Sequence, residues 1–73
     1  MTDAEMLKLL QAIKDRCDTQ ASDLAKLKAA GVDVQGDDGT TLDDMIQREY
    51  QAGQSVEKAT RPIRDRIARE PQS

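Results

Sequence analysis

The sequence predicts an all-α fold in which two long helices form an antiparallel hairpin that self-associates. Apolar residues recur at steps of three and four along two stretches of the chain, which is the pattern of amphipathic helices. The stretch 31–39 between them is rich in glycine and aspartate and has no helical period. With 73 residues and a single aromatic side chain, Tyr50, the chain has material for one small core only. A partner copy is the expected means of stabilising it.

The first helix is expected over about residues 3–30. Thr2 and Glu5 have the spacing of a capping box at its start, and Gly31 supplies the left-handed residue that ends a helix. The predicted packing seam of this helix consists of Met6, Leu10, Ile13, Cys17, Leu24 and Leu27, with Gln20 as one polar interruption.

The second helix is expected over about 41–69, after a loop at 31–39. Thr40 or Thr41 caps it, with Asp43 or Asp44 three residues further on. Its predicted apolar stripe consists of Leu42, Ile46, Gly53, Val56, Thr60, Ile63 and Ile67, with Met45 and Tyr50 on a neighbouring face. Two long helices joined by a short loop pack antiparallel, so the whole chain, 1–73, is expected to be one domain.

Two residues weaken the second helix. Gly53 is either tolerated there or marks a close approach, by the facing helix near Gln20 and Cys17 or by a ligand. Pro62 cannot donate to the carbonyl of Lys58, so it either kinks the helix or starts a last segment capped by Thr60.

Charge is unevenly distributed along a chain whose net charge is −3. The loop region carries Asp33, Asp37, Asp38, Asp43 and Asp44, and the end of the second helix carries Lys58, Arg61, Arg64, Arg66 and Arg69. Both groups complement the helix macrodipoles, and the arginines are also suited to form an anion site where several copies meet. The acidic balance argues against binding to duplex nucleic acid.

Neither metal binding nor catalysis is indicated. From Asp33 the loop has the oxygen-bearing residues of a calcium loop at several positions, but Asp38 stands where such a loop requires glycine. There is no histidine, and Cys17 lies on the apolar seam as a small buried hydrophobe. We therefore expect a protein that is not an enzyme and needs no cofactor. The acidic N-terminus and the absence of a long apolar stretch predict a location in the cytoplasm and no membrane contact.

Two fragments carry a resemblance to a known family. "LLQAIK", Leu9 to Lys14, and "YQAGQSVEKATRP", Tyr50 to Pro62, resemble two motifs of the small phage proteins that sequester cyclic oligonucleotide signals of bacterial CBASS immunity. Together they cover about a third of the chain. Gln54 stands where that family has Phe, and Leu42 where it has Trp.

This resemblance to the anti-CBASS sponges implies a helical protomer that assembles into a homo-oligomer, a hexamer, and traps cyclic di- or trinucleotides between protomers in the host cytoplasm without cleaving them. It implies that Lys14 and Arg61 neutralise phosphates and that Gly53 admits a base or a backbone closely. Tyr50 would offer the one ring for stacking, and Arg64 lies beside Arg61 in the same basic segment.

A hypothesis of a different class stays open. The same hairpin is suited to a small acidic inhibitor or adaptor that binds a host protein, with Asp33 through Asp44 as a surface that mimics nucleic acid. A structural subunit of a larger assembly is a third interpretation.

Overall fold

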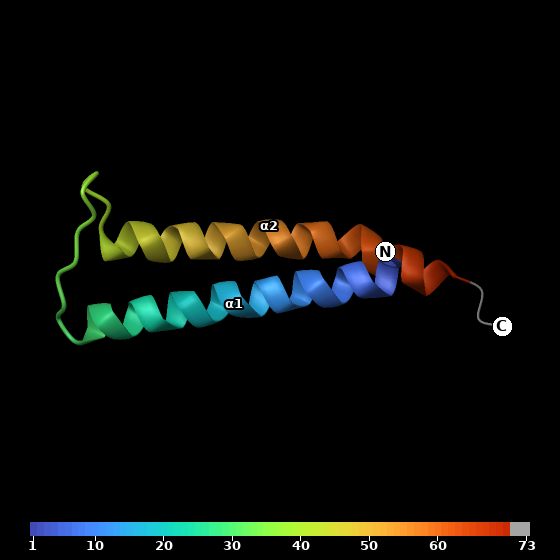
Figure 1. Ribbon diagram of the computed structural model, residues 1–73, viewed down its shortest axis with the longest axis horizontal. Coiled ribbons are helices and arrows are strands. Elements are labelled where there is room, and N and C mark those ends of the chain that lie inside the picture. The colour runs from blue at the N-terminus through green and yellow to red at the C-terminus, as the bar shows by residue number, and fades with distance from the viewer. Residues whose placement is uncertain (71–73) are drawn as a thin grey trace.

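The computed structural model describes residues 1–70 and confirms the helical hairpin (Figure 1). Helix α1 spans Asp3–Ala29 and helix α2 spans Leu42–Arg69, and the two pack side by side along their length. The loop lies at one end of the molecule, whereas the start of α1 and the end of α2 lie at the other. Each helix is one residue shorter at the loop than the sequence predicted, because Ala30 and Thr41 are the cap residues.

Hydrogen bonds with residues beside α1 define both of its ends. After α1, Gly31 has a φ of 76°, and the N–H groups of Gly31 and Val32 donate to the carbonyls of Lys28 and Leu27. This is the Schellman motif, and it confirms Gly31 as the residue that ends α1. At the start of α1, the N–H of Glu5 donates to the Thr2 hydroxyl at 3.1 Å. The Glu5 carboxylate accepts from that hydroxyl rather than from the Thr2 backbone, so the predicted capping box is only half formed.

The start of α2 has the complete capping box. The N–H of Asp44 donates to the Thr41 hydroxyl at 3.2 Å, and the N–H of Thr41 donates to the Asp44 carboxylate at 3.1 Å. Of the two predicted threonines, Thr41 is therefore the cap. Thr40 instead donates its N–H and its hydroxyl to the Asp38 carboxylate, which closes the turn before the helix.

The stripe predicted for α2 is confirmed, but the seam predicted for α1 is partly wrong. In α2 every residue of the predicted stripe is buried or half-buried. In α1, Ile13, Gln20 and Leu27 are exposed, and the interface instead uses two residues that follow them by one position, Lys14 and Ala21. Both seams share Leu10, Cys17 and Leu24, so α1 can rotate by part of a turn between them. The rotation observed places the small Ala21 in the interface.

Pro62 lies inside α2 and does not break it. The helix continues from Leu42 to Arg69, so no third helix begins at Thr60. In Figure 1 the last turns of α2, coloured orange-red to red, slope away from the direction of the earlier ones. Thr60 is almost fully buried, and its hydroxyl donates to the carbonyl of Glu57 at 2.7 Å. A bend with intact helical conformation on both sides is the usual effect of an internal proline.

The hairpin is long, and its core is thin. Its dimensions are 56 × 21 × 17 Å, and its radius of gyration is 16.6 Å. A compact domain of this length would have a radius of gyration of about 11 Å. The buried apolar residues of the described part are Cys17, Ala21, Leu42 and Ile63. Ion pairs close both ends of the helix pair: Lys28 with Asp43 beside the loop, and Arg66 with Asp3 at the other end.

Candidate anion-binding stripe

Four of the five residues singled out as ligand-binding lie along one side of α2. Positions 50, 53, 57, 61 and 64 follow one another at steps of three or four, so they share one face of the helix. Tyr50, Arg61 and Arg64 are exposed on that face, and Gly53 is buried under it. We call this set, together with Lys14 of α1, the basic stripe.

Lys14 joins the basic stripe from the other helix. A methyl group added at Gly53 would lie 3.4 Å from Cδ, 3.6 Å from Cε and 3.6 Å from Nζ of Lys14. The lysine side chain therefore crosses α2 where the missing side chain of Gly53 leaves room. The close approach expected at Gly53 exists, but its partner is the side chain of Lys14 and not the part of α1 near Gln20 and Cys17.

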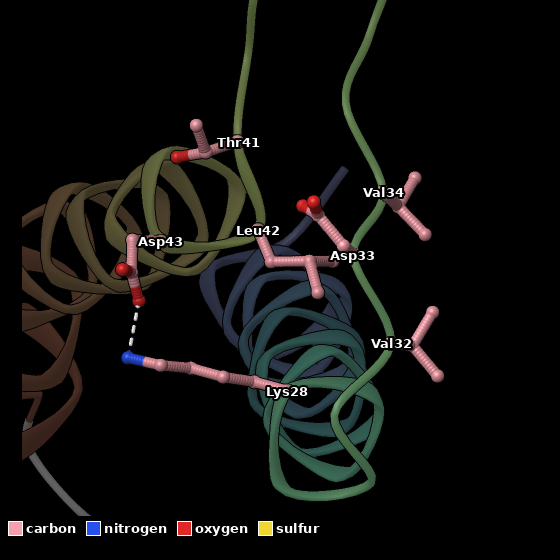
Figure 2. Close-up of a pocket in the computed structure, with 7 residues that line it drawn as sticks. All are labelled: Lys28, Val32, Asp33, Val34, Thr41, Leu42 and Asp43. Carbon is pink, nitrogen blue, oxygen red and sulfur yellow. Dashed lines mark hydrogen bonds and ion pairs between the residues drawn. The ribbon is translucent and has the colours of Figure 1, made fainter.

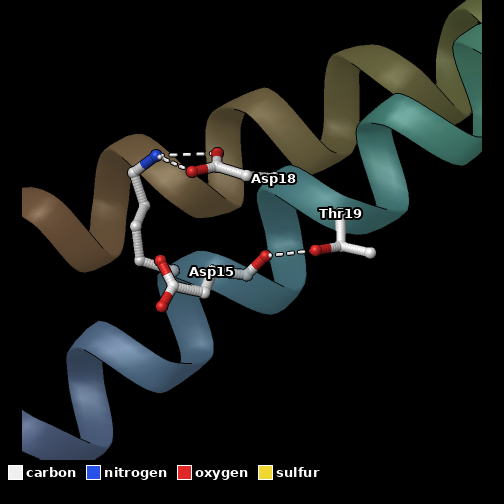
Figure 3. Close-up of polar contacts among 4 residues, drawn as sticks. Asp15, Asp18 and Thr19 are labelled. Atoms are coloured by element: carbon white, nitrogen blue, oxygen red, sulfur yellow. Dashed lines mark hydrogen bonds and ion pairs between the residues drawn. The ribbon is translucent and has the colours of Figure 1, made fainter.

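The ammonium of Lys14 is held by a carboxylate of its own helix. Its Nζ donates to the two oxygens of Asp18 at 2.8 and 3.0 Å (Figure 3). This hydrogen bond raises the pKa of Lys14 above its usual value, and the negative charges of Asp18 and Glu57 act in the same direction. Figure 3 also shows the Thr19 hydroxyl donating to the carbonyl of Asp15, which is a local contact within α1. An anion that binds Lys14 must therefore replace Asp18.

The closeness of the four arginines in the sequence suggested that they act as one group. In the structure their contacts differ. Arg66 donates from Nη2 and Nε to the two carboxylate oxygens of Asp3, at 3.0 and 3.2 Å. This bidentate pair lowers the pKa of Asp3 and raises that of Arg66. Arg61, Arg64 and Arg69 make no ion pair within residues 1–70. Of these three guanidinium groups, Arg61 and Arg64 lie on the face of Tyr50 and are the ones that the stripe offers to an external anion.

The sequence interpretation missed two residues of this surface, Asp18 and Glu57. Both are carboxylates near the Lys14 ammonium. The spacing of four between Lys14 and Asp18 was a usable signal, because residues four apart on a helix are neighbours. The closeness of Glu57 depends on how α1 and α2 are aligned, which the sequence does not reveal.

The acidic loop is largely committed to its own fold. Asp38 holds the turn, Asp44 caps α2, and Asp43 pairs with Lys28. Hydrogen bonds from the Thr40 hydroxyl and then the Thr40 N–H lower the pKa of Asp38, and those from the N–H and the hydroxyl of Thr41 lower that of Asp44. No group of three side chains that could hold a metal ion occurs among residues 1–70.

These carboxylates predict acid sensitivity. A carboxyl group whose pKa is lower in the folded state stabilises the fold fully above its unfolded pKa, about 3.9, and loses that contribution as the pH falls through the folded value. We expect the melting temperature to fall below about pH 4, and Asp44→Asn to reduce the size of that fall. Circular dichroism melts between pH 7 and pH 2.5 measure it. Asp37→Asn, on the exposed turn, is the matched control and should keep the wild-type profile.

A hollow beside the loop is a weaker candidate. It is lined by Lys28, Val32, Asp33, Val34, Thr41, Leu42 and Asp43 (Figure 2). Val32 and Val34 point away from Leu42, and the Lys28 ammonium faces Asp43. The hollow therefore has one apolar side chain and an internally neutralised charge pair, which is little for a ligand to bind.

No family model, curated protein or solved structure that was compared with the chain matches it. Neither α1 nor α2 is long and apolar enough to cross a membrane. The function is therefore argued from the basic stripe itself.

Proposed function

We propose that the protein binds and sequesters cyclic di- or trinucleotides between copies of itself, as a non-enzymatic anti-defence protein of phage type. The observation that carries this proposal is that the Lys14 side chain lies over Gly53 while Tyr50, Arg61 and Arg64 share the same face of α2. One lysine, two guanidiniums and one ring fit a ligand of alternating phosphates and bases.

Each group has a definite task in this proposal. Arg61 and Arg64 bind phosphate oxygens, for which the planar guanidinium has matched donors. The exposed ring of Tyr50 stacks on a base. The Lys14 ammonium releases Asp18 and binds a second phosphate, so one charge-assisted hydrogen bond is replaced by another. One stripe covers only one side of a small ligand, so a second copy is needed to enclose it.

The competing function, a protein-binding mimic of nucleic acid, has less support. It relies on free carboxylates at the loop, and Asp38, Asp43 and Asp44 already have partners in the chain. Asp33 and Asp37 would remain as its active surface.

The proposal predicts selective loss of nucleotide binding on reversing two charges. Native mass spectrometry of the wild type with individual cyclic di- and trinucleotides should show added masses of intact nucleotide. Arg61→Glu with Arg64→Glu should weaken this binding about 100-fold or more. Each substitution removes a hydrogen bond to a charged phosphate, and each new carboxylate repels the phosphate.

The matched control is Lys8→Glu with Lys26→Glu. It has the same net charge, and both positions are exposed and nine residues from the buried Cys17, which places them on the side of α1 that faces away from α2. This control should bind nearly as the wild type does at physiological salt, where distant charges are screened. A wild type that gains no nucleotide, or a control that loses binding as fully as the stripe variant, would refute the proposal.

A further inference from the structure

A second surface of the hairpin is apolar and lies on the other side from the basic stripe. On α1 this surface consists of apolar residues that do not face α2. Among them, Leu9, Ile13 and Leu27 are 51, 38 and 41% exposed. With the half-buried Met6, these positions recur at steps of three, four and twice seven, so they lie on one helix face.

Helix α2 continues this surface. Its positions 45, 52, 56, 59 and 63 share a face and are occupied by Met45, Ala52, Val56, Ala59 and Ile63. Met6, Leu9 and Leu10 line one open hollow together with Ile63, so the apolar residues of the two helices lie on the same side of the hairpin. We call the two sets together the apolar face.

One polar pair interrupts the apolar face. Gln20 lies opposite Glu49, and with its amide nitrogen toward the carboxylate the N–O distances are 3.1 and 3.0 Å. The pair satisfies itself within one hairpin, so covering this face would not leave it without partners.

We propose that a second copy of this chain covers the apolar face, forming a four-helix bundle in which the two hairpins point in opposite directions. The thin core requires such a partner, because the described residues have no large side chain that is fully buried. The face also has the geometry of the missing half of a bundle, since each helix presents one apolar stripe to its hairpin neighbour and another, part of a turn away, to a further helix.

Charge selects the direction of the second hairpin. The loop end carries five aspartates, and the opposite end of α2 carries Lys58 and four arginines. A two-fold axis along the helices would place both acidic ends together. A two-fold axis across them places each acidic loop beside the partner's basic end. The second arrangement is the one that we infer.

The same arrangement is consistent with the spacing of α1. Full overlap of two opposed hairpins puts the axis near the middle of α1, close to Arg16 and Cys17. Met6 then faces the partner's Leu27, and Leu9 faces the partner's Leu24. Apolar side chains thus meet apolar side chains along the helix, and Ile13 covers the aliphatic part of the partner's Gln20.

The bundle does not depend on the proposed nucleotide function. In it both basic stripes face outward, so the dimer forms without a ligand and a nucleotide is enclosed only where two dimers meet. A failure of nucleotide binding would therefore leave the dimer intact, and a failure of the dimer appears in the protein alone.

The first test is the mass of the ligand-free protein, measured by light scattering during size exclusion at micromolar concentration. We expect a dimer, or an even multiple of the chain, and a shift to monomer for Ile13→Glu. Ala12→Glu adds the same charge one residue away on the exposed outer side of α1 and should keep the wild-type mass. A monomeric wild type, or an Ile13→Glu protein of unchanged mass, would overturn the inference.

The second test uses the folded dimer and does not depend on a disruptive variant. In a Cys17→Ala background that keeps the wild-type mass, Asp37→Cys on the exposed loop is labelled with a nitroxide for electron spin distance measurement. Opposed hairpins place the two labels at a distance near the 56 Å length of one hairpin. A separation comparable with the 21 Å width would show that the loops lie at the same end and would overturn the inferred direction.

Discussion

Ile63→Ala is expected to lower the free energy of unfolding by about 2–4 kcal/mol, the range for truncating a buried isoleucine. Ile63 is only 8% exposed and shares a hollow with Met6 and Leu10 near the open end of the hairpin. A chain of this length has a total stability of about 4–11 kcal/mol, so this one change removes a large share of it. Urea unfolding followed by circular dichroism at fixed protein concentration measures the loss, and the melting temperature should fall by roughly 15 °C.

Val34→Ala is the matched control for that loss. Val34 is 41% exposed and its side chain points away from Leu42 (Figure 2). The control should stay within about 0.5 kcal/mol of the wild type, as exposed substitutions usually do. Equal losses in the two variants would mean that Ile63 does not pack as the structure shows.

The parts of the fold that depend on neighbours in sequence could be predicted. Gly31 ends α1 because glycine readily adopts the left-handed conformation, and this requires no contact from α2. Thr41 caps α2 through Asp44, which is only three residues away. The stripe of α2 was also predictable, since Leu42, Ile46, Val56, Ile63 and Ile67 recur at helical spacing and define one apolar face.

The parts of the fold that depend on how the two helices pack against each other could not be predicted. The sequence allowed two seams on α1 that share Leu10, Cys17 and Leu24, and only packing against α2 decides between Ile13 and Lys14 as the inward residue. The same decision creates both surfaces of functional interest. It turns Lys14 onto Gly53, and it leaves Ile13 outside on the apolar face.

The candidate site follows the same division. Tyr50, Gly53, Arg61 and Arg64 share a helix face by spacing alone, so their grouping could be predicted. Two assignments required the structure: Arg66 pairs with Asp3, which lies 63 residues earlier in the chain, and the side chain of Lys14 lies over Gly53 of the other helix. The predicted cluster of four arginines therefore contains one whose role is to join the helix ends.

Pro62→Ala is expected to raise the free energy of unfolding by about 1–3 kcal/mol. Alanine restores the N–H that would donate to the carbonyl of Lys58 and removes the propensity cost of an internal proline, which is about 3 kcal/mol in an unperturbed helix. The gain should be smaller than that limit because α2 already accommodates the proline by bending. Urea unfolding at fixed protein concentration measures it, with Pro62→Gly as the control that restores the N–H but not the helix propensity. Glycine should gain about 1 kcal/mol less than alanine.

The sign of the Pro62→Ala effect also tests what the bend is for. Straightening α2 beyond residue 62 would move Arg66 relative to Asp3, and the bidentate pair between them has distances of 3.0 and 3.2 Å that a small shift would lengthen. The Arg66 side chain is half exposed, so solvent screens this pair and its loss should cost less than the restored helix gains. If Pro62→Ala nevertheless destabilised the protein, the bend would have to serve a larger contact. The apolar face supplies that contact, because Ile63 follows the proline directly and its direction sets how the end of α2 meets a second copy.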